Sequence, residues 1–141
     1  MMWVIDASVA LRWFLKDEDH PHASAVLRSV IAQPEFFAVP ELFAYEVYAV
    51  LCRLHPHGDE VFISGVLPLL NGGLLRQPMT ETMAMLAANY VKKGLTGYDA
   101  CYAALAEELK GIWLTFDEKA ERLLATEEIA HNLSKDLPAN W

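Results

Sequence analysis

The chain has 141 residues, of which 54% are hydrophobic and 21% charged, and its formal net charge is −8. This length and composition suit one domain with a sizeable core and argue against intrinsic disorder. The acidic balance argues against nucleic-acid binding through a broad basic face, although a metal-dependent nuclease, in which a cation meets the phosphate, remains compatible with it.

No apolar run approaches the roughly 18 residues that span a bilayer, and the N-terminus lacks the basic region of a signal peptide. Cys52 and Cys101 lie in helical patterns without metal-ligand spacing, which is typical of buried free thiols in a reducing compartment. We therefore expect a cytoplasmic chain with no membrane segment.

The first half of the chain predicts two strands among helices. Trp3-Val4-Ile5 is a short apolar run that ends at Asp6, before a helical pattern, as in a buried strand that enters a helix. Pro40 opens a long helix, because proline is tolerated in a first turn. The elements expected in this half are strands at 3–5 and 36–39 and helices at 9–15, 22–31 and 41–54, with a polar break at 17–21.

The second half continues the alternation. Gly94 and Gly111 each follow a helical run and are expected to end it as left-handed residues. The expected elements are helices at 59–70 (limited by Pro68), 81–93, 96–110 and 118–124, strands at 112–116 and 129–133 (an edge), and a strand or extended link at 74–78. Strands alternating with helices predict a single-domain, three-layer α/β/α sandwich with a mostly parallel sheet over 1–141, and the tail after about 134 is expected to be loose.

Acidic residues occur where strands meet helices. Asp6 and Asp117 each follow an apolar strand and precede a helix, and ligands of open α/β sheets bind at the carboxyl ends of the strands. Helix N-capping is the alternative interpretation of both. Asp99 also has a capping interpretation, since Thr96 and Asp99 form a weak capping box.

Glu46 is harder to explain as a structural residue. Its neighbours one turn away are Leu42, Ala49 and Val50, so it lies within or beside the apolar stripe of its helix. An ionised carboxylate there is costly unless a cation or hydrogen bonds compensate it. Arg53, the candidate for a salt bridge, is nearly two turns away.

Four carboxylates brought together would repel one another and raise their own pKa values. A divalent cation relieves that repulsion, and an all-oxygen ligand set favours Mg²⁺ or Mn²⁺ over zinc. Such a cation activates water for attack on phosphorus, so the pattern indicates metal-dependent phosphodiester hydrolysis. A phosphatase with an aspartyl nucleophile would need Asp-x-Asp, and here Ser8 holds the second position; no glycine fingerprint for a dinucleotide follows the first strand.

Four blocks of the chain resemble the PIN-domain ribonucleases, and within them the VapC-type toxins of bacterial and archaeal toxin–antitoxin pairs. The resemblance covers nearly the whole chain in order, and the third block is the most specific. The blocks are Val4-Ile5-Asp6-Ala7-Ser8, then Pro40-Glu41-Leu42 with Glu46-Val47, then Thr96-Gly97-Tyr98-Asp99-Ala100-Cys101-Tyr102-Ala103-Ala104-Leu105-Ala106, and Leu114-Thr115-Phe116-Asp117.

The resemblance implies an acidic pocket that holds Mg²⁺ or Mn²⁺ and cleaves RNA. Its carboxylates would be Asp6, Glu46, Asp99 and Asp117, supported by the hydroxyls of Ser8 and Thr115. Within that pocket, Asp6 and Asp99 match the main metal ligands. Asp117 would hold a second metal or a coordinated water, and Glu46 would orient or deprotonate the attacking water.

The resemblance also implies a homodimer and a VapB-type antitoxin whose C-terminal segment enters the active site. Four basic residues are candidates for contact with RNA, although solvated surface is the simpler interpretation of each: Arg12, Lys16, Lys92 and Lys93. The alternative function is a catalytically silent binding module of the same fold, which would engage an antitoxin or RNA.

Overall fold

A five-stranded, all-parallel sheet forms the centre of the computed structural model, which describes residues 1–141. The strand order is β3-β2-β1-β4-β5, so β1 lies in the middle. The strands are β1 Trp3–Ile5, β2 Phe37–Pro40, β3 Leu75–Gln77, β4 Ile112–Thr115 and β5 Ala130–Asn132. Four of them lie within predicted runs, and β2 extends one residue beyond its run to Pro40, which was expected to open the helix. The segment at 74–78 contains a true strand, and β5 is an edge strand as expected.

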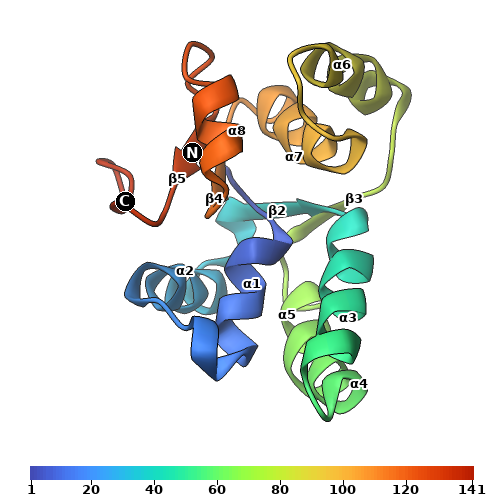
Figure 1. The fold of residues 1–141 in the computed structure, drawn as a ribbon, viewed down its shortest axis with the longest axis vertical. Helices are drawn as coiled ribbons and strands as arrows, with labels where there is room; N and C mark the ends of the chain where they lie inside the picture. Colours follow the sequence, from blue (N-terminus) through green and yellow to red (C-terminus); the bar gives the residue numbers. More distant parts are fainter.

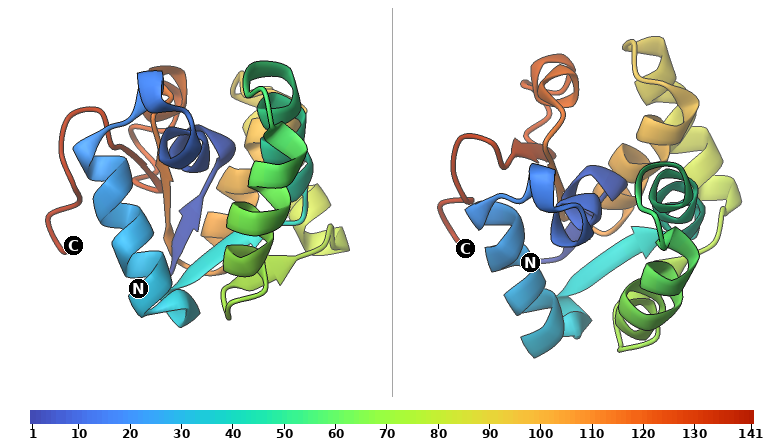
Figure 2. Two further views of the ribbon diagram at one scale, coloured as in Figure 1. Left: turned by 90° about the horizontal axis from the view of Figure 1, so that it is seen from below. Right: turned by 60° about the horizontal axis from the view of Figure 1, so that its bottom comes forward.

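Helices cover both faces of the sheet (Figure 1). On one face, α7 packs against β1, β2 and β4, and α6 packs outside α7; α1, α2 and α3 cover the opposite face (Figure 2). Their bounds are α1 Ala7–Phe14, α2 Pro21–Ala32, α3 Leu42–Leu54, α6 Glu81–Lys92, α7 Gly97–Glu108 and α8 Glu118–Leu123, with short 3-10 turns η1 Lys16–Glu18 and η2 Pro34–Phe36. The predicted three-layer α/β/α sandwich is confirmed.

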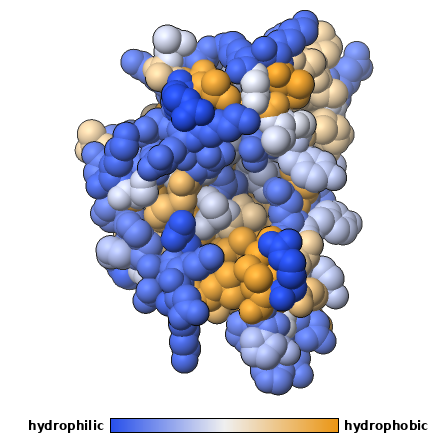
Figure 3. Space-filling view, in the orientation of Figure 1, coloured by the Kyte–Doolittle hydropathy of each residue, from blue (hydrophilic) through white to orange (hydrophobic).

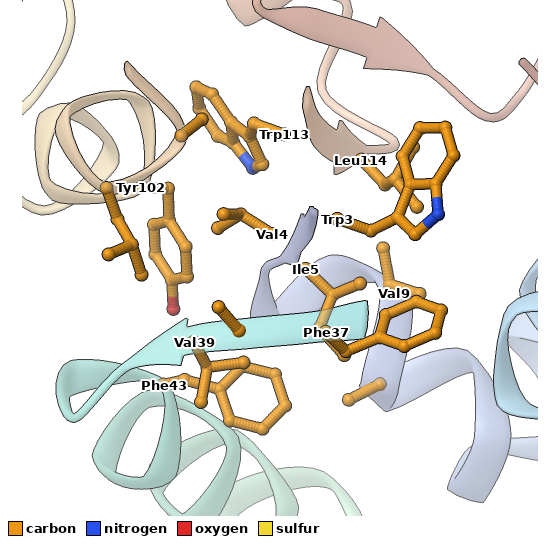
Figure 4. Packing of buried hydrophobic residues seen from close by; sticks show 14 of the residues in the cluster. Trp3, Val4, Ile5, Val9, Phe37, Val39, Phe43, Tyr102, Trp113 and Leu114 are labelled. Atoms are coloured by element: carbon orange, nitrogen blue, oxygen red, sulfur yellow. The ribbon is translucent and has the colours of Figure 1, made fainter. Parts of the chain in front are cut away.

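The core lies between the sheet and these helices. Val4 pairs in register with Trp113 of β4, and both side chains lie on the α7 side of the sheet together with Tyr102 (Figure 4). Every residue of α7 from Ala100 to Ala106 is buried, because α6 covers the side of α7 that the sheet leaves open. None of the helices is long and apolar enough to cross a bilayer.

The predicted helix at 59–70 is a helical segment of three parts. It comprises α4 Gly58–Val61, a π-helical turn η3 Phe62–Val66, and α5 Leu67–Leu70. Pro68 was predicted to limit the helix, but it lies inside α5, shortly after the π-helical turn. A π turn changes the hydrogen-bonding pattern locally, and so accommodates a residue without an N–H.

The ends of α6 and α7 differ from each other. Gly94 has a φ of 110° and ends α6 as a left-handed residue, as predicted. After α7 the left-handed residue is Lys110, with a φ of 54°, and Gly111 is not left-handed. Glycine is required at position 111 for a different reason, because a Cβ there would lie 2.2 Å from the carbonyl oxygen of Met2. The prediction that Gly111 is the left-handed cap was therefore wrong.

Two further expectations differ from the structure. Cys101 is buried but Cys52 is exposed, because the inward stripe of α3 consists of Phe43, Val47 and Leu51. The tail, expected to be loose, places the Trp141 ring 5.4 Å from that of Trp3 and 6.3 Å from that of Phe37.

One face of the molecule carries a patch of apolar side chains among hydrophilic ones, in the area of α1 and α3 (Figure 3). A hollow of about 480 Å³ lies there between the C-terminal ends of the two helices, lined by Phe14, Leu15 and Leu54 among others. The other residues that line it are polar: Lys16, Asp17, Glu18 and His55.

The close approach at Gly111 predicts a large effect of Gly111→Ala. The added Cβ would displace the Met2 carbonyl group beside β1, and such overpacking lowers the free energy of unfolding by about 1–3 kcal/mol. Gly97→Ala is the matched control, because a Cβ there meets nothing within 4 Å. Urea denaturation of both variants measures the difference in their free energies of unfolding. Equal midpoints would show that the contact with Met2 does not require a glycine at position 111.

Candidate active site

Four acidic residues from four elements lie around the carboxyl ends of the central strands. Asp6 directly follows β1, and Asp117 comes two residues after β4, its parallel neighbour. Parallel strands that pair in register end at the same edge of the sheet, so both carboxylates lie at that edge. Asp99 is in the first turn of α7, and Glu46 is in α3 on the opposite side of the sheet.

Asp6 is the most deeply placed of the four, with 7% of its surface exposed. Its Oδ1 accepts hydrogen bonds from the backbone N–H of Ser8 (2.9 Å) and from the Ser8 hydroxyl (2.5 Å). Its Oδ2 accepts a hydrogen bond from the indole Nε1 of Trp113 (2.9 Å). Asp6 therefore caps α1, as the capping interpretation predicted, and is also hydrogen-bonded to β4.

The two hydroxyls that the sequence placed beside the acids do contact this region. Ser8 Oγ donates to Asp6 and also accepts from the backbone N–H of Phe116 (3.1 Å), which links the ends of β1 and β4. Thr115 Oγ1 accepts from the backbone N–H of Asp117 (3.1 Å). Both hydroxyls thus stabilise the backbone turns that carry Asp6 and Asp117.

Glu46 is half-buried, and its partner is an aromatic hydroxyl instead of Arg53. The Tyr102 hydroxyl donates to Glu46 Oε1 at 2.6 Å. Tyr102 was not among the predicted site residues, and neither was Trp113. One signal was available for Tyr102: it lies three residues after Asp99, hence one turn further along the same helix. Nothing in the sequence indicated that Trp113 would reach Asp6.

Asp99 and Asp117 both lie at helix N-termini. Thr96 Oγ1 accepts from the backbone N–H of Asp99 (3.1 Å), so the predicted cap of α7 is present. Asp117 Oδ1 accepts from the backbone N–H of Lys119 (2.9 Å) and caps α8. Capping and a place in the acidic cluster are therefore compatible, because capping Asp117 occupies only one side of its carboxylate.

The acids influence one another electrostatically. Burial raises the pKa of Asp6, and the charge of Asp99 raises it further, against hydrogen bonds from Ser8, Thr115 and Trp113. Burial also raises the pKa of Glu46, against the Tyr102 hydrogen bond, with added repulsion from Asp6 and Asp99. The pKa of Asp99 is raised by burial and by the charge of Asp117. Charges within such range favour a bound cation.

No three acidic, histidine or cysteine side chains lie close enough together in this structure to hold a metal ion. The chemistry of the donors nevertheless fits Mg²⁺ or Mn²⁺, because the four predicted site acids are all carboxylates. Burial is the main cause of the raised pKa values of Asp6, Glu46 and Asp99, and the charges of neighbouring acids add a repulsion that a cation would relieve.

The four basic residues predicted to contact RNA lie outside the acidic cluster, whereas the charge of Lys119, which was not predicted, lowers the pKa of Asp99. The Arg12 guanidinium lies over the ring of Phe116, 4.0 Å from its centroid, and donates to the Glu18 carbonyl (3.1 Å). Lys93 forms an ion pair with Glu127. Lys16 and Lys92 are exposed. Arg12 is thus the basic candidate closest to the site, because Phe116 adjoins Asp117.

The PIN domain family profile matches residues 3–124, most of the chain. The chain belongs to the PIN domain family. No curated protein matches this PIN domain in sequence.

Several solved structures share the fold of this PIN domain. FitAcB from Neisseria gonorrhoeae is 20% identical, with a TM-score of 0.70, covering 93% of this chain and 97% of its own. VapBC2 from Rickettsia felis, bound to a DNA fragment from their promoter, is 13% identical, with a TM-score of 0.67 and coverage of 94% and 98%. VapC20 from Mycobacterium tuberculosis, a sarcin–ricin loop cleaving toxin, is 11% identical, with a TM-score of 0.65 and coverage of 90% and 96%.

The raised pKa of Asp99 predicts that Asp99→Asn stabilises the metal-free PIN domain at neutral pH. A carboxyl whose folded pKa lies above its ordinary value of 3.8 costs stability as pH rises past that value, because the folded state holds the proton more tightly than the unfolded state. The variant lacks this cost, so its melting temperature at pH 7 exceeds that of the wild type, and the difference shrinks toward pH 3.

Asp59→Asn, on an exposed turn of α4, removes the same charge away from the cluster and should change the melting temperature little. Calorimetry in chelator-treated buffer checks both variants. A lower melting temperature for Asp99→Asn than for the wild type at pH 7 would argue against repulsion at this site.

Proposed function

We propose that this PIN domain is a Mg²⁺/Mn²⁺-dependent endoribonuclease and the toxin of a type II toxin–antitoxin system. The proposal is supported by Asp6 and Asp117, which follow two paired parallel strands, and by charge repulsion that reaches Asp6 from Asp99, Glu46 from Asp6 and Asp99, and Asp99 from Asp117, in addition to the larger effect of burial on the pKa of each. A soluble fold gains nothing from placing like charges together unless a cation compensates them. PIN nucleases generally use divalent metals, which agrees with this donor set.

Asp6 and Asp99 would be the principal metal ligands, and Asp117 would join them or hold a second ion. The metal, when bound, supplies charge neutralisation at the phosphate and lowers the pKa of the attacking water. Asp6 is oriented before any ligand arrives, since Ser8 and Trp113 hold both of its oxygens. Asp117 keeps Oδ2 available, because capping of α8 uses Oδ1.

Glu46 would take the proton of the attacking water. Tyr102 donates to Oε1, so Oε2 is the oxygen that can accept that proton. Burial raises the pKa of Glu46 and thereby improves it as a general base near neutral pH. Ser8 and Thr115 keep the turns that carry the other acids in place.

The toxin assignment rests on the structural neighbours. They include a toxin–antitoxin complex from Klebsiella pneumoniae, 15% identical, with a TM-score of 0.65 and coverage of 92% of this chain. VapC20 is a sarcin–ricin loop cleaving toxin, and VapBC2 is bound to a DNA fragment from their promoter. By this analogy the chain would act in the cytoplasm on RNA as a homodimer and bind a VapB-type antitoxin.

RNA cleavage is expected to require Mn²⁺ or Mg²⁺ and to stop on chelation. Asp99→Asn should abolish it by removing a ligand, and Glu46→Gln should lower the rate by about 10²–10⁴-fold, as for loss of a general base. Asp59→Asn is the control with unchanged activity. Mapping of RNA ends after incubation with total RNA is the measurement, with circular dichroism to confirm folding.

Cleavage that survives Asp99→Asn and chelation would contradict the proposal. Tight antitoxin binding without Mn²⁺ binding or cleavage would favour the catalytically silent module.

Induced expression without antitoxin is expected to arrest growth for the wild type and not for Asp99→Asn. Co-expression with the product of a short upstream reading frame should restore growth and yield a stable complex. Light scattering of the purified chain should give twice its mass of 15.8 kDa. Equal growth of both strains, with soluble protein confirmed, would remove the support for a toxin.

A further inference from the structure

We propose that Tyr102 and Trp113 form a stacked aromatic pair that positions two of the four acids, Asp6 for the cation and Glu46 for the attacking water. This inference rests on the proposed function, since it assigns a role to two residues behind that site. Neither ring is part of the acidic cluster itself. Both act through the carboxylate to which they donate, so they are positioning residues.

Trp113 fixes Asp6 from the buried side of the site. Its ring is completely buried on β4, and Nε1 donates to Asp6 Oδ2 at 2.9 Å. An ionised carboxylate has about four acceptor positions. Ser8 takes two on Oδ1, and Trp113 takes one on Oδ2. Ser8 thus occupies Oδ1, and the indole fixes the orientation of Oδ2, the oxygen of Asp6 that is less occupied and that a cation would contact.

Tyr102 holds Glu46 in the same way. Its ring is 1% exposed, and its hydroxyl donates to Glu46 Oε1 at 2.6 Å. This bond spans the sheet edge, from α7 on one face to α3 on the other. It is the hydrogen bond that compensates a half-buried carboxylate, and it fixes Oε1 and leaves Oε2 as the oxygen without this donor.

The two rings are packed against each other. Their centroids are 5.9 Å apart and their planes are inclined by 15°, which is a stacked arrangement. Figure 4 shows both rings together on the α7 side of the sheet, next to Val4. A rotation of either ring would displace the other, so the orientations of Asp6 and Glu46 are coupled through this contact.

The aromatic pair therefore connects Asp6, at the end of β1, with Glu46 in α3. The connection runs through Trp113 of β4 and Tyr102 of α7. Residues that orient ligands from behind typically contribute about 10–100-fold to metal affinity. A merely structural role would instead affect folding stability alone, and the chain offers matched aromatic residues that separate these two roles.

The test measures Mn²⁺ affinity of the metal-free protein by titration calorimetry, together with melting temperature. Trp113→Phe and Tyr102→Phe remove one hydrogen-bond donor each and keep a ring in the stack. Trp113→Phe is expected to weaken Mn²⁺ binding about tenfold, and Tyr102→Phe to weaken it by less, because Asp6 is a ligand of the cation whereas Glu46 orients the attacking water. The double variant is expected to lose less than the product of the two single losses, because the residues act as one unit.

Trp13→Phe and Tyr90→Phe are the controls. Trp13 Nε1 donates to the Ala23 carbonyl (2.8 Å), and Tyr90 is a buried tyrosine of α6 beside Glu107, both away from the acids. They should lower the melting temperature without changing Mn²⁺ affinity. Since Tyr102→Phe only deletes a hydroxyl, it serves as the folded variant if Trp113→Phe is insoluble.

Affinities equal to those of the controls, or losses that multiply fully, would overturn the inference. A wild type that binds no Mn²⁺ would overturn both it and the metal dependence proposed above. A wild type that binds Mn²⁺ in a Tyr102- and Trp113-dependent way, yet cleaves no RNA, would support the pair and contradict only the ribonuclease.

Discussion

The repulsion among carboxylates at the carboxyl edge of the sheet is the constraint on which the site depends. Asp6 is buried at the end of the central strand, where its charge is costly and the charge of Asp99 adds to the cost. The surrounding structure compensates Asp6 with three hydrogen bonds, one of them from a tryptophan buried in the next strand. Such compensation is strong enough to keep the acid in place, but it leaves repulsion that a cation would relieve.

The fold explains why this repulsion can be sustained. All strands are parallel, so their carboxyl ends share one edge, and the helices that follow them begin there. The N-termini of α1, α7 and α8 offer backbone N–H groups to negative charge. Behind this edge, the sheet and α7 form a continuous apolar core. The stability of this core offsets the destabilising effect of the acidic residues.

The sequence predicted the features that depend on local pattern. Strand ends, helix caps and the acidic residues follow from short-range periodicity, and the three-layer architecture follows from their alternation. Glu46 was recognised because it broke the apolar stripe of its helix. The partners were not predictable, because Trp113 is 107 residues from Asp6 in the chain and Tyr102 is 56 from Glu46. Strand register brings Trp113 to Asp6, and the packing of α7 and α3 on the sheet brings Tyr102 to Glu46.

Other errors have the same origin. Gly111 resembled a helix cap in sequence, but the reason for a glycine is the carbonyl of Met2, the residue that precedes β1. Cys52 was expected to be buried because it lies in an apolar helical run. It is exposed, because a different stripe of α3 faces the sheet. Pro68 was expected to limit a helix, and the preceding π turn accommodates it. Each case concerns a contact or a distortion that no window of a few residues contains.

Ser8 shows how closely the strand ends are joined at this edge. Its hydroxyl donates to Asp6 and accepts from the backbone N–H of Phe116, so one atom connects the turn after β1 with the turn after β4. The following residue, Asp117, belongs to the second turn. A hydroxyl can do this because it is both donor and acceptor, whereas an alanine or a cysteine would break at least one connection. The spacing of Asp6 and Asp117 is therefore maintained by backbone-anchored hydrogen bonds as well as by the sheet. This rigidity is what a site needs if a cation is to bind between acids that repel one another, because ligands that were free to move apart would relieve their repulsion without it.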